Sequence, residues 1–254
     1  MLKIRMTMKK ITLFLAVLLL GTAAAAQSRD SVQLRGGSAS VDWMQPFSGV
    51  SISGPMRVTF VRAGEDGAMR VSYDARSNAA SRVKVSVDRD GVLNLREKSS
   101  REAADTTEVT ICYRVLESLS VDGAEVRFEQ PVTEPMIDVR FSGGARAELA
   151  FDVRDLVMNV TGKCCLALSG SARYFDLTVS TARVDAGRLT TMSARVDASH
   201  GAAVEVCAEE RLEAYAASSR IRYAGQPEIL RGETALLGGE IISSDEAVEV
   251  DNRK

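Results

Sequence analysis

The chain has 254 residues, with 32 Lys and Arg against 34 Asp and Glu, one His and one Trp. Four of the basic residues lie in the first 26 positions, so the rest of the chain has 28 basic and 34 acidic residues, a net charge of −6. An acidic chain without a basic cluster is a poor candidate for binding nucleic acid. The length beyond residue 26 suits a single domain, and all-β domains of this size are common.

Residues 1–26 have the three parts of a secretory signal peptide. A basic start precedes the ten-residue apolar core ITLFLAVLLL (residues 11–20), and an A-x-A pattern predicts cleavage after Ala26. This core is too short to span a bilayer, and no later segment is long and apolar enough to cross one as a helix. We therefore predict an exported protein, located in the periplasm, at the outer-membrane surface or outside the cell.

The remainder is predicted to be one domain between two polar ends. Residues 27–46 form a short polar N-terminal segment, and residues 243–254 form an acidic polar C-terminal tail. Between them, patterns such as MRVTFV, RVKVSVD and VLNLR alternate apolar and polar residues, which is typical of half-buried strands. The strands of residues 47–113 are expected to form the first coils or a cap.

In the second half of the chain, small turn residues recur about every 19 positions, each preceded by a short alternating strand. These turn residues are Gly123, Gly143, Gly162, Thr181, His200, Ser219 and Gly239. A fixed period of this length, with two or three short strands and one tight turn, indicates a solenoid whose equivalent strands stack as parallel ladders. The sequence therefore predicts an all-β, single-domain parallel β-helix over residues 47–242.

Several segments carry a family resemblance. They are the opening Phe-x-x-Val-x-Ile-x-Gly at Phe47, the later EVTICYRVLESLSVDGAEV and LLGGEI, and Ile221-x-Tyr223-x-Gly225-x-Pro227. With them the chain resembles the GIN-domain family, the auto-transporter adhesin head proteins of Bacteroidetes-type bacteria. The resemblance covers about 200 residues. It implies a right-handed parallel β-helix and a role in adhesion, and the family has no established catalytic residues.

The pentamer ARVDA occurs twice, at residues 182–186 and 194–198. The copies are 12 residues apart, whereas the coil repeat is about 19, so they are predicted to lie on different faces of one coil. Alternation places Ala and Val inward, and Arg and Asp outward. Asp185 and Asp197 should then point in different directions, whereas acid–base catalysis needs two carboxylates in one cleft.

Other signs of catalysis are weak, and we predict no catalytic, cofactor-binding or metal-binding residue. The outward acids are scattered along the axis and interleaved with arginines; they are Glu125, Asp138, Glu148, Asp185 and Glu205. His200, the only histidine, is expected at a coil turn, where a polar residue can tolerate an unusual backbone. A polysaccharide-active enzyme on a β-helix stays open as an alternative.

The four cysteines are Cys112, Cys164, Cys165 and Cys207. An even number in an exported chain suggests disulfides. The coil register, however, places Cys164 and Cys165 two coils from Cys207, roughly 9–10 Å away and beyond the reach of a disulfide. We expect unpaired, partly buried cysteines, although a strained vicinal Cys164–Cys165 bond stays open.

A few aromatic residues are the candidate ligand-contact surface. Tyr174, Phe175, Tyr215 and Tyr223 fall within a few coils and could form an exposed platform for carbohydrate. They could equally fill the core or shield a coil corner. The leading hypothesis is a non-catalytic, adhesin-like or envelope-associated module with a protein or glycan partner. A structural envelope protein that self-associates as a homo-oligomer is a further alternative.

Overall fold

The computed structural model describes residues 32–35, 37–42, 45–64, 67–75, 82–98, 106–235 and 238–244. The chain divides into two compact units, Met1–Val32 and Gln33–Lys254. The predicted signal peptide lies outside the described residues, as does the predicted tail apart from its first two residues. The predicted polar segment is described in part, and it contains two strands.

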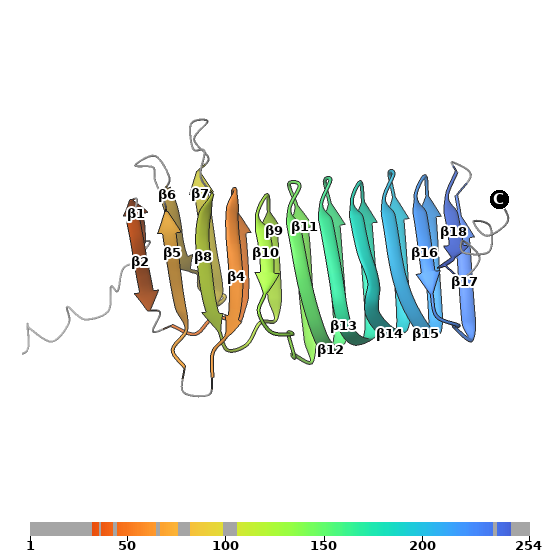
Figure 1. The fold of residues 1–254 in the computed structure, drawn as a ribbon, viewed down its shortest axis with the longest axis horizontal. Helices are drawn as coiled ribbons and strands as arrows, with labels where there is room; N and C mark the ends of the chain where they lie inside the picture. The colour runs from red at the N-terminus through yellow and green to blue at the C-terminus, as the bar shows by residue number, and fades with distance from the viewer. Residues whose placement is uncertain are drawn as a thin grey trace, which may run out of the picture. The chain divides into compact units, whose positions relative to one another are not determined.

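Every named element of the described chain is a strand (Figure 1). The strands are β1 Val32–Arg35, β2 Gly37–Asp42, β3 Gly49–Ser53, β4 Met56–Arg62, β5 Arg70–Ala75, β6 Arg82–Val87, β7 Val92–Lys98, β8 Thr107–Tyr113, β9 Ser118–Asp122, β10 Glu125–Phe128, β11 Met136–Ser142, β12 Arg146–Thr161, β13 Cys165–Ser180, β14 Arg183–Ser199, β15 Ala203–Ala217, β16 Arg220–Ala224, β17 Ile229–Thr234 and β18 Glu240–Ser243.

The strands form two long ladders, which we call the first face and the second face. The first face runs β2–β5–β8–β4–β10, continues through the N-terminal halves of β12 to β15, and ends at β16 and β18. The second face runs β6–β7–β3–β9–β11, continues through the C-terminal halves of β12 to β15, and ends at β17. In the order of these two ladders, every pairing that follows β3 and β4 is parallel.

The N-terminal end is built differently from the coils. There β5 pairs antiparallel with both β2 and β8, and β6 pairs antiparallel with β7. Antiparallel pairing thus ends both faces at the N-terminal side, by a hairpin of β6 and β7 on the second face and by strands that are distant in the chain on the first. Residues 47–113 form early strands of both faces, and β1 and β2, from the predicted polar segment, pair with β6 and β5 ahead of them.

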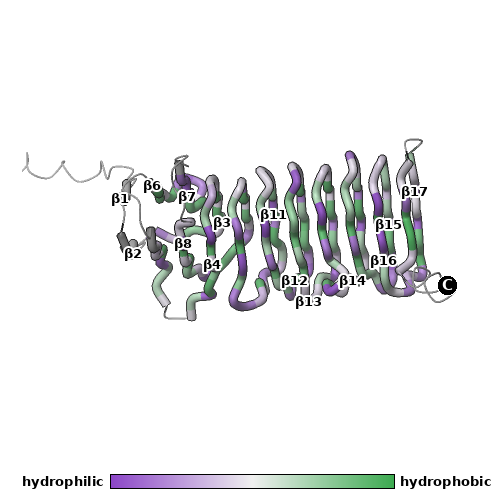
Figure 2. Tube along the Cα trace, turned by 45° about the horizontal axis from the view of Figure 1, so that its top comes forward, coloured by the Kyte–Doolittle hydropathy of each residue, from purple (hydrophilic) through white to green (hydrophobic). Residues whose placement is uncertain are grey.

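Alternation along the chain explains how one coil makes both faces. In β12, every second residue from Ala147 to Val153 and again from Leu156 to Val160 is buried. Two consecutive residues, Arg154 and Asp155, break the alternation. The strand bends there and carries its next apolar residues to the opposite side of the same core. Figure 2 shows the resulting repeat of hydrophilic and hydrophobic stretches in successive coils.

Tight turns close the coil at the end opposite the bend. Thr181 and His200 have φ values of 58° and 55°, in the left-handed region, and Gly143 and Gly162 occupy the same turn in earlier coils at 67° and 72°. These turns recur at the predicted period of about 19. In the sixth turn, the positive φ belongs to Ser218 rather than Ser219.

The prediction of an all-β solenoid is confirmed, but the strands are longer than expected. The sequence suggested two or three short strands in each coil, whereas β12 to β15 are continuous over 15 to 17 residues. Between β12 and β13 the ladder continues on both sides of the bend, because Val153 pairs with Ala172 and Asp155 pairs with Tyr174, whereas between β14 and β15 the register shifts there. A prediction from apolar–polar alternation ends a strand wherever the alternation is interrupted. The hydrogen-bonded backbone can nevertheless continue through that point.

Candidate binding face

The two faces of the coil differ in what they expose to solvent. Seven large apolar side chains are exposed in the described part of the chain, and six of them lie on the second face. These six are Met136, Val157, Tyr174, Tyr215, Ile229 and Leu230; the seventh, Val115, lies in the loop before β9. A clustered exposure of apolar side chains on one face is a common mark of an interaction surface.

The first part of this surface is an apolar cluster on β11, β12 and β13. Met136, Val157 and Tyr174 are 52%, 36% and 49% exposed. Met136 pairs with Asp155, which pairs with Tyr174, so Met136 and Tyr174 stand two rungs apart in one outward column. The guanidinium carbon of Arg173 lies 5.6 Å from the centre of the Tyr174 ring, within the range of a cation–π contact.

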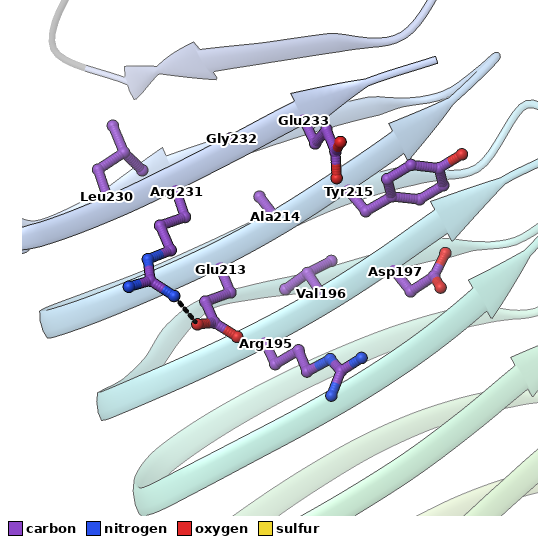
Figure 3. A pocket seen from close by; sticks show the side chains of 10 residues that line it. All are labelled: Arg195, Val196, Asp197, Glu213, Ala214, Tyr215, Leu230, Arg231, Gly232 and Glu233. Carbon is purple, nitrogen blue, oxygen red and sulfur yellow. Dashed lines mark ion pairs between the residues drawn. The ribbon is translucent and has the colours of Figure 1, made fainter.

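The second part is a shallow, charged depression over β14, β15 and β17 (Figure 3). The ladder sets Asp197 beside Tyr215 and Tyr215 beside Glu233, so that the exposed ring lies between two carboxylates. The neighbouring outward column holds Arg195, Glu213 and Arg231. Arg195 lines both this depression and the apolar cluster, and therefore joins them into one surface.

Arginines surround the carboxylate of Glu213. Arg211 donates a hydrogen bond to Glu213, and Nη1 of Arg231 lies 3.5 Å from Oε1 of Glu213. The hydrogen bond from Arg211 is the main reason that the pKa of Glu213 is lowered, with further contributions from the charges of Arg211, Arg231 and Arg195. Glu213 is thus held as a carboxylate, which suits an ion-pair partner and not a proton donor.

The structure separates the four aromatic residues that the sequence singled out. Tyr174 and Tyr215 are exposed on the second face. Phe175, at 2% exposure, lies in the core, where it pairs with Leu156 and Ala194. Tyr223 is half-buried on the first face and packs against the core. The four residues therefore do not form one platform.

Sequence reasoning missed the apolar members of the second face. Met136 and Val157 occupy outward positions of their strands, as their place in the alternation shows. Leu230 is exposed for another reason: it stands in an inward column, but at the end of the stack. A search for apolar residues at outward phase could have found the first two.

The twin ARVDA pentamers lie on different faces of β14, as predicted. Asp185 pairs with Ala167 and Glu205 on the first face, whereas Asp197 pairs with Thr178 and Tyr215 on the second. The alanines and valines of both copies are buried, and both aspartates are exposed. These two carboxylates therefore share no cleft.

The four cysteines are free in the structure. Cys164 is buried, Cys165 is exposed, and Cys112 and Cys207 are half-buried. Burial raises the pKa of the Cys164 and Cys207 thiols, which makes them poor nucleophiles. Cys165 pairs with Arg183 on β14, which in turn pairs with Ala203 on β15, the strand that holds Cys207. The predicted separation of two coils is confirmed.

His200 is exposed at its turn, with Nδ1 3.3 Å from Oγ of Ser180. Among the described residues, no group of three His, Cys, Asp or Glu side chains could hold a metal ion. The same residues include no helix that is long and apolar enough to cross a membrane.

Residues 46–227 match the model of the family described as "Putative auto-transporter adhesin, head GIN domain". Because the match covers most of the chain, the protein belongs to this GIN-domain family. The resemblance seen in the sequence is thereby confirmed. No curated protein matches the chain.

Solved structures share the fold. A protein from Bacteroides fragilis titled a putative adhesin superposes with a TM-score of 0.70 at 17% identity, covering 85% of this chain and 98% of its own. A putative adhesin from Parabacteroides merdae has a TM-score of 0.60 at 14% identity, with coverages of 83% and 98%. A putative lipid binding protein from Parabacteroides distasonis has a TM-score of 0.58 at 14% identity, with coverages of 82% and 97%. At these identities, the likeness shows the fold alone.

Proposed function

We propose that the protein is an exported, non-catalytic, adhesin-like module of the cell envelope that binds a glycan chain through its second face. The observation that carries this proposal is the concentration of exposed apolar side chains on that face. The adhesin description of the family supports it. The predicted signal peptide supports export.

The chemistry of the second face suits a carbohydrate. Sugar rings present apolar C–H faces that stack on exposed aromatic rings, and their hydroxyls bond to carboxylates and guanidinium groups. Tyr215 supplies the ring, and Asp197 and Glu233 supply carboxylates on the neighbouring rungs. Tyr174 stands two rungs and four residues away from Tyr215, a separation of roughly 16 Å at the usual strand spacings. A glycan of several sugar units would reach both rings.

A protein partner fits the same face less well. The exposed apolar side chains alternate with charged ones and do not form a continuous apolar centre; Val157, for example, is followed in its column by Asp176 and then by Arg195. Stable protein interfaces are usually depleted of charge at their centre. If the second face bound a protein and no glycan, the assignment of a glycan ligand would therefore be wrong.

Binding to envelope and host polysaccharides, immobilised as an array, tests the proposal. We expect Tyr174→Ala and Tyr215→Ala each to weaken binding about three- to tenfold, because each removes one stacking ring. Arg127→Ala and Arg222→Ala on the first face are the matched controls and should leave binding unchanged. Equal losses in the first-face variants would contradict a site on the second face.

A polysaccharide-active enzyme is the second candidate, because the depression gathers Asp197, Glu213 and Glu233 with Arg195 and Arg231. Ion pairing of Glu213 argues against it, since a general acid needs a raised pKa and not a lowered one. Product analysis after incubation with the bound polysaccharide separates the two candidates. New chain ends that vanish in Asp197→Asn would establish catalysis.

Location can be tested on intact cells. Protease treatment should degrade the protein if it stands at the cell surface, as an adhesin must. Complete protection behind an intact outer membrane would contradict the adhesin role and leave a periplasmic binding module.

A further inference from the structure

Two neighbouring outward columns of the second face differ in how their charges are arranged. In one column, residues of opposite charge follow one another on successive rungs; they are Asp176, Arg195, Glu213 and Arg231. In the next column, Tyr215 lies between Asp197 and Glu233, and the rung before Asp197 holds the neutral Thr178. Opposite charges on neighbouring rungs stabilise a ladder. The second column therefore carries negative charge that its own neighbouring rungs do not balance.

The arginines of the depression are engaged with Glu213 and not with these two carboxylates. Arg211 and Arg231 both form ion pairs with Glu213. Asp197 and Glu233 are exposed, and neither forms an ion pair or a side-chain hydrogen bond with any residue that the structure describes. Both carboxylates are thus available to a positively charged ligand.

The ring of Tyr215 supplies the centre of this column, as Figure 3 shows. The side chain is 39% exposed, and its rung lies between those of Asp197 and Glu233. Neighbouring rungs are roughly 4.8 Å apart, so the backbones of the two acids are roughly 10 Å apart. A cation is attracted to the face of an aromatic ring within about 6 Å of its centre. A cation on the Tyr215 ring would therefore lie between the two carboxylates.

We propose that Asp197, Tyr215 and Glu233 form a subsite for the ammonium group of an amino sugar. This inference rests on the proposed function, because it names the class of glycan that the second face binds: a polysaccharide with free amines. The ammonium group gains the attraction of the ring and of both carboxylates. A neutral sugar gains only stacking and ordinary hydrogen bonds, and an acidic sugar is repelled by the same column.

Two oligosaccharides with one backbone test this subsite separately from the proposed function. Oligomers of β-1,4-linked glucosamine carry a free amine on every unit, whereas the fully N-acetylated oligomers carry none. At a mildly acidic pH, with the amines protonated, calorimetry should show about tenfold tighter binding of the glucosamine oligomer. Added salt should reduce this preference, because the subsite is open to solvent and its charges are screened.

Substitutions in the column should change the preference in a set order. Asp197→Asn and Glu233→Gln should each reduce it about threefold, and the double variant should remove it. Tyr215→Phe should retain the preference, because the aromatic face remains, whereas Tyr215→Leu should lose most of it. Glu148→Gln is the matched control, because it removes one outward carboxylate from the first face and should leave the preference as it is.

Three results would overturn the subsite. The first is equal affinity for the two oligomers; if Tyr174→Ala and Tyr215→Ala still weakened glycan binding, the proposed function would stand without it. The second is a preference that Asp197→Asn and Glu233→Gln change no more than Glu148→Gln does. The third is binding of a lysine-rich peptide and of neither oligosaccharide, because the carboxylates would then serve a protein partner.

Discussion

The two faces of each coil share one core and one backbone ladder, yet they present different surfaces. On the first face, outward residues are mainly charged and pair across rungs, as in Arg57 with Glu125 and Arg220 with Glu240. On the second face, charged residues share the surface with five exposed outward apolar side chains, besides Leu230 at the end of the stack. Both faces have apolar inward columns. Folding therefore does not require the outward residues of the two faces to differ. The difference therefore points to an interaction on the second face.

The largest expected effect comes from comparing the stability cost of substituting an inward and an outward aromatic residue of the second face. Phe175→Ala should destabilise the protein by about 3–5 kcal/mol, because a fully buried ring leaves a cavity. Tyr174→Ala, at the preceding outward position, should cost less than about 1 kcal/mol. Urea unfolding of both variants measures this contrast. Equal losses would show that Tyr174 is a core residue, and would remove it from the binding face.

Close to the bend that joins the two faces, an added side chain should be rejected in one coil and tolerated in the next. Gly170 has a φ of 103°, and a Cβ there would lie 1.9 Å from the carbonyl oxygen of Phe151. Gly170→Ala should therefore cost about 2 kcal/mol or more.

Gly187, in the following coil, is the matched control for Gly170. Its Cβ would come no closer than 3.4 Å to Oδ1 of Asp185, and its φ lies outside the left-handed region. Gly187→Ala should be neutral or slightly stabilising, because it restricts the unfolded chain. Similar unfolding midpoints for the two variants would contradict a close approach of the backbones at Gly170.

The smallest expected effect concerns charge. The pKa of Glu213 is lowered in the folded protein, so its contribution to stability is present above the ordinary glutamate pKa and is lost as the pH falls through the lowered value. The stability difference between the wild type and Glu213→Gln should therefore shrink on acidification. Unfolding titrations from neutral to acid pH measure this difference.

Much of the fold was accessible from the chain because a solenoid repeats its signal. A mistaken strand boundary in one coil is corrected by the next, and the turns at Thr181 and His200 confirmed the period even though neither is glycine. The candidate site was less accessible. Tyr174 and Phe175 are adjacent aromatic residues. Which of them faces solvent depends on where the inward–outward alternation is interrupted at the bend.

By itself, the sequence determined the all-β class, the coil period, the inward columns and the opposite placement of the twin pentamers, because alternation and spacing are local along the chain. Only the tertiary structure decided which outward residues share a face and which column is left uncovered at the end of the stack. Met136, Tyr174 and Tyr215 are far apart in sequence and meet on one surface through coil stacking. Stacking register is set by the summed packing of many coils, which no single segment encodes.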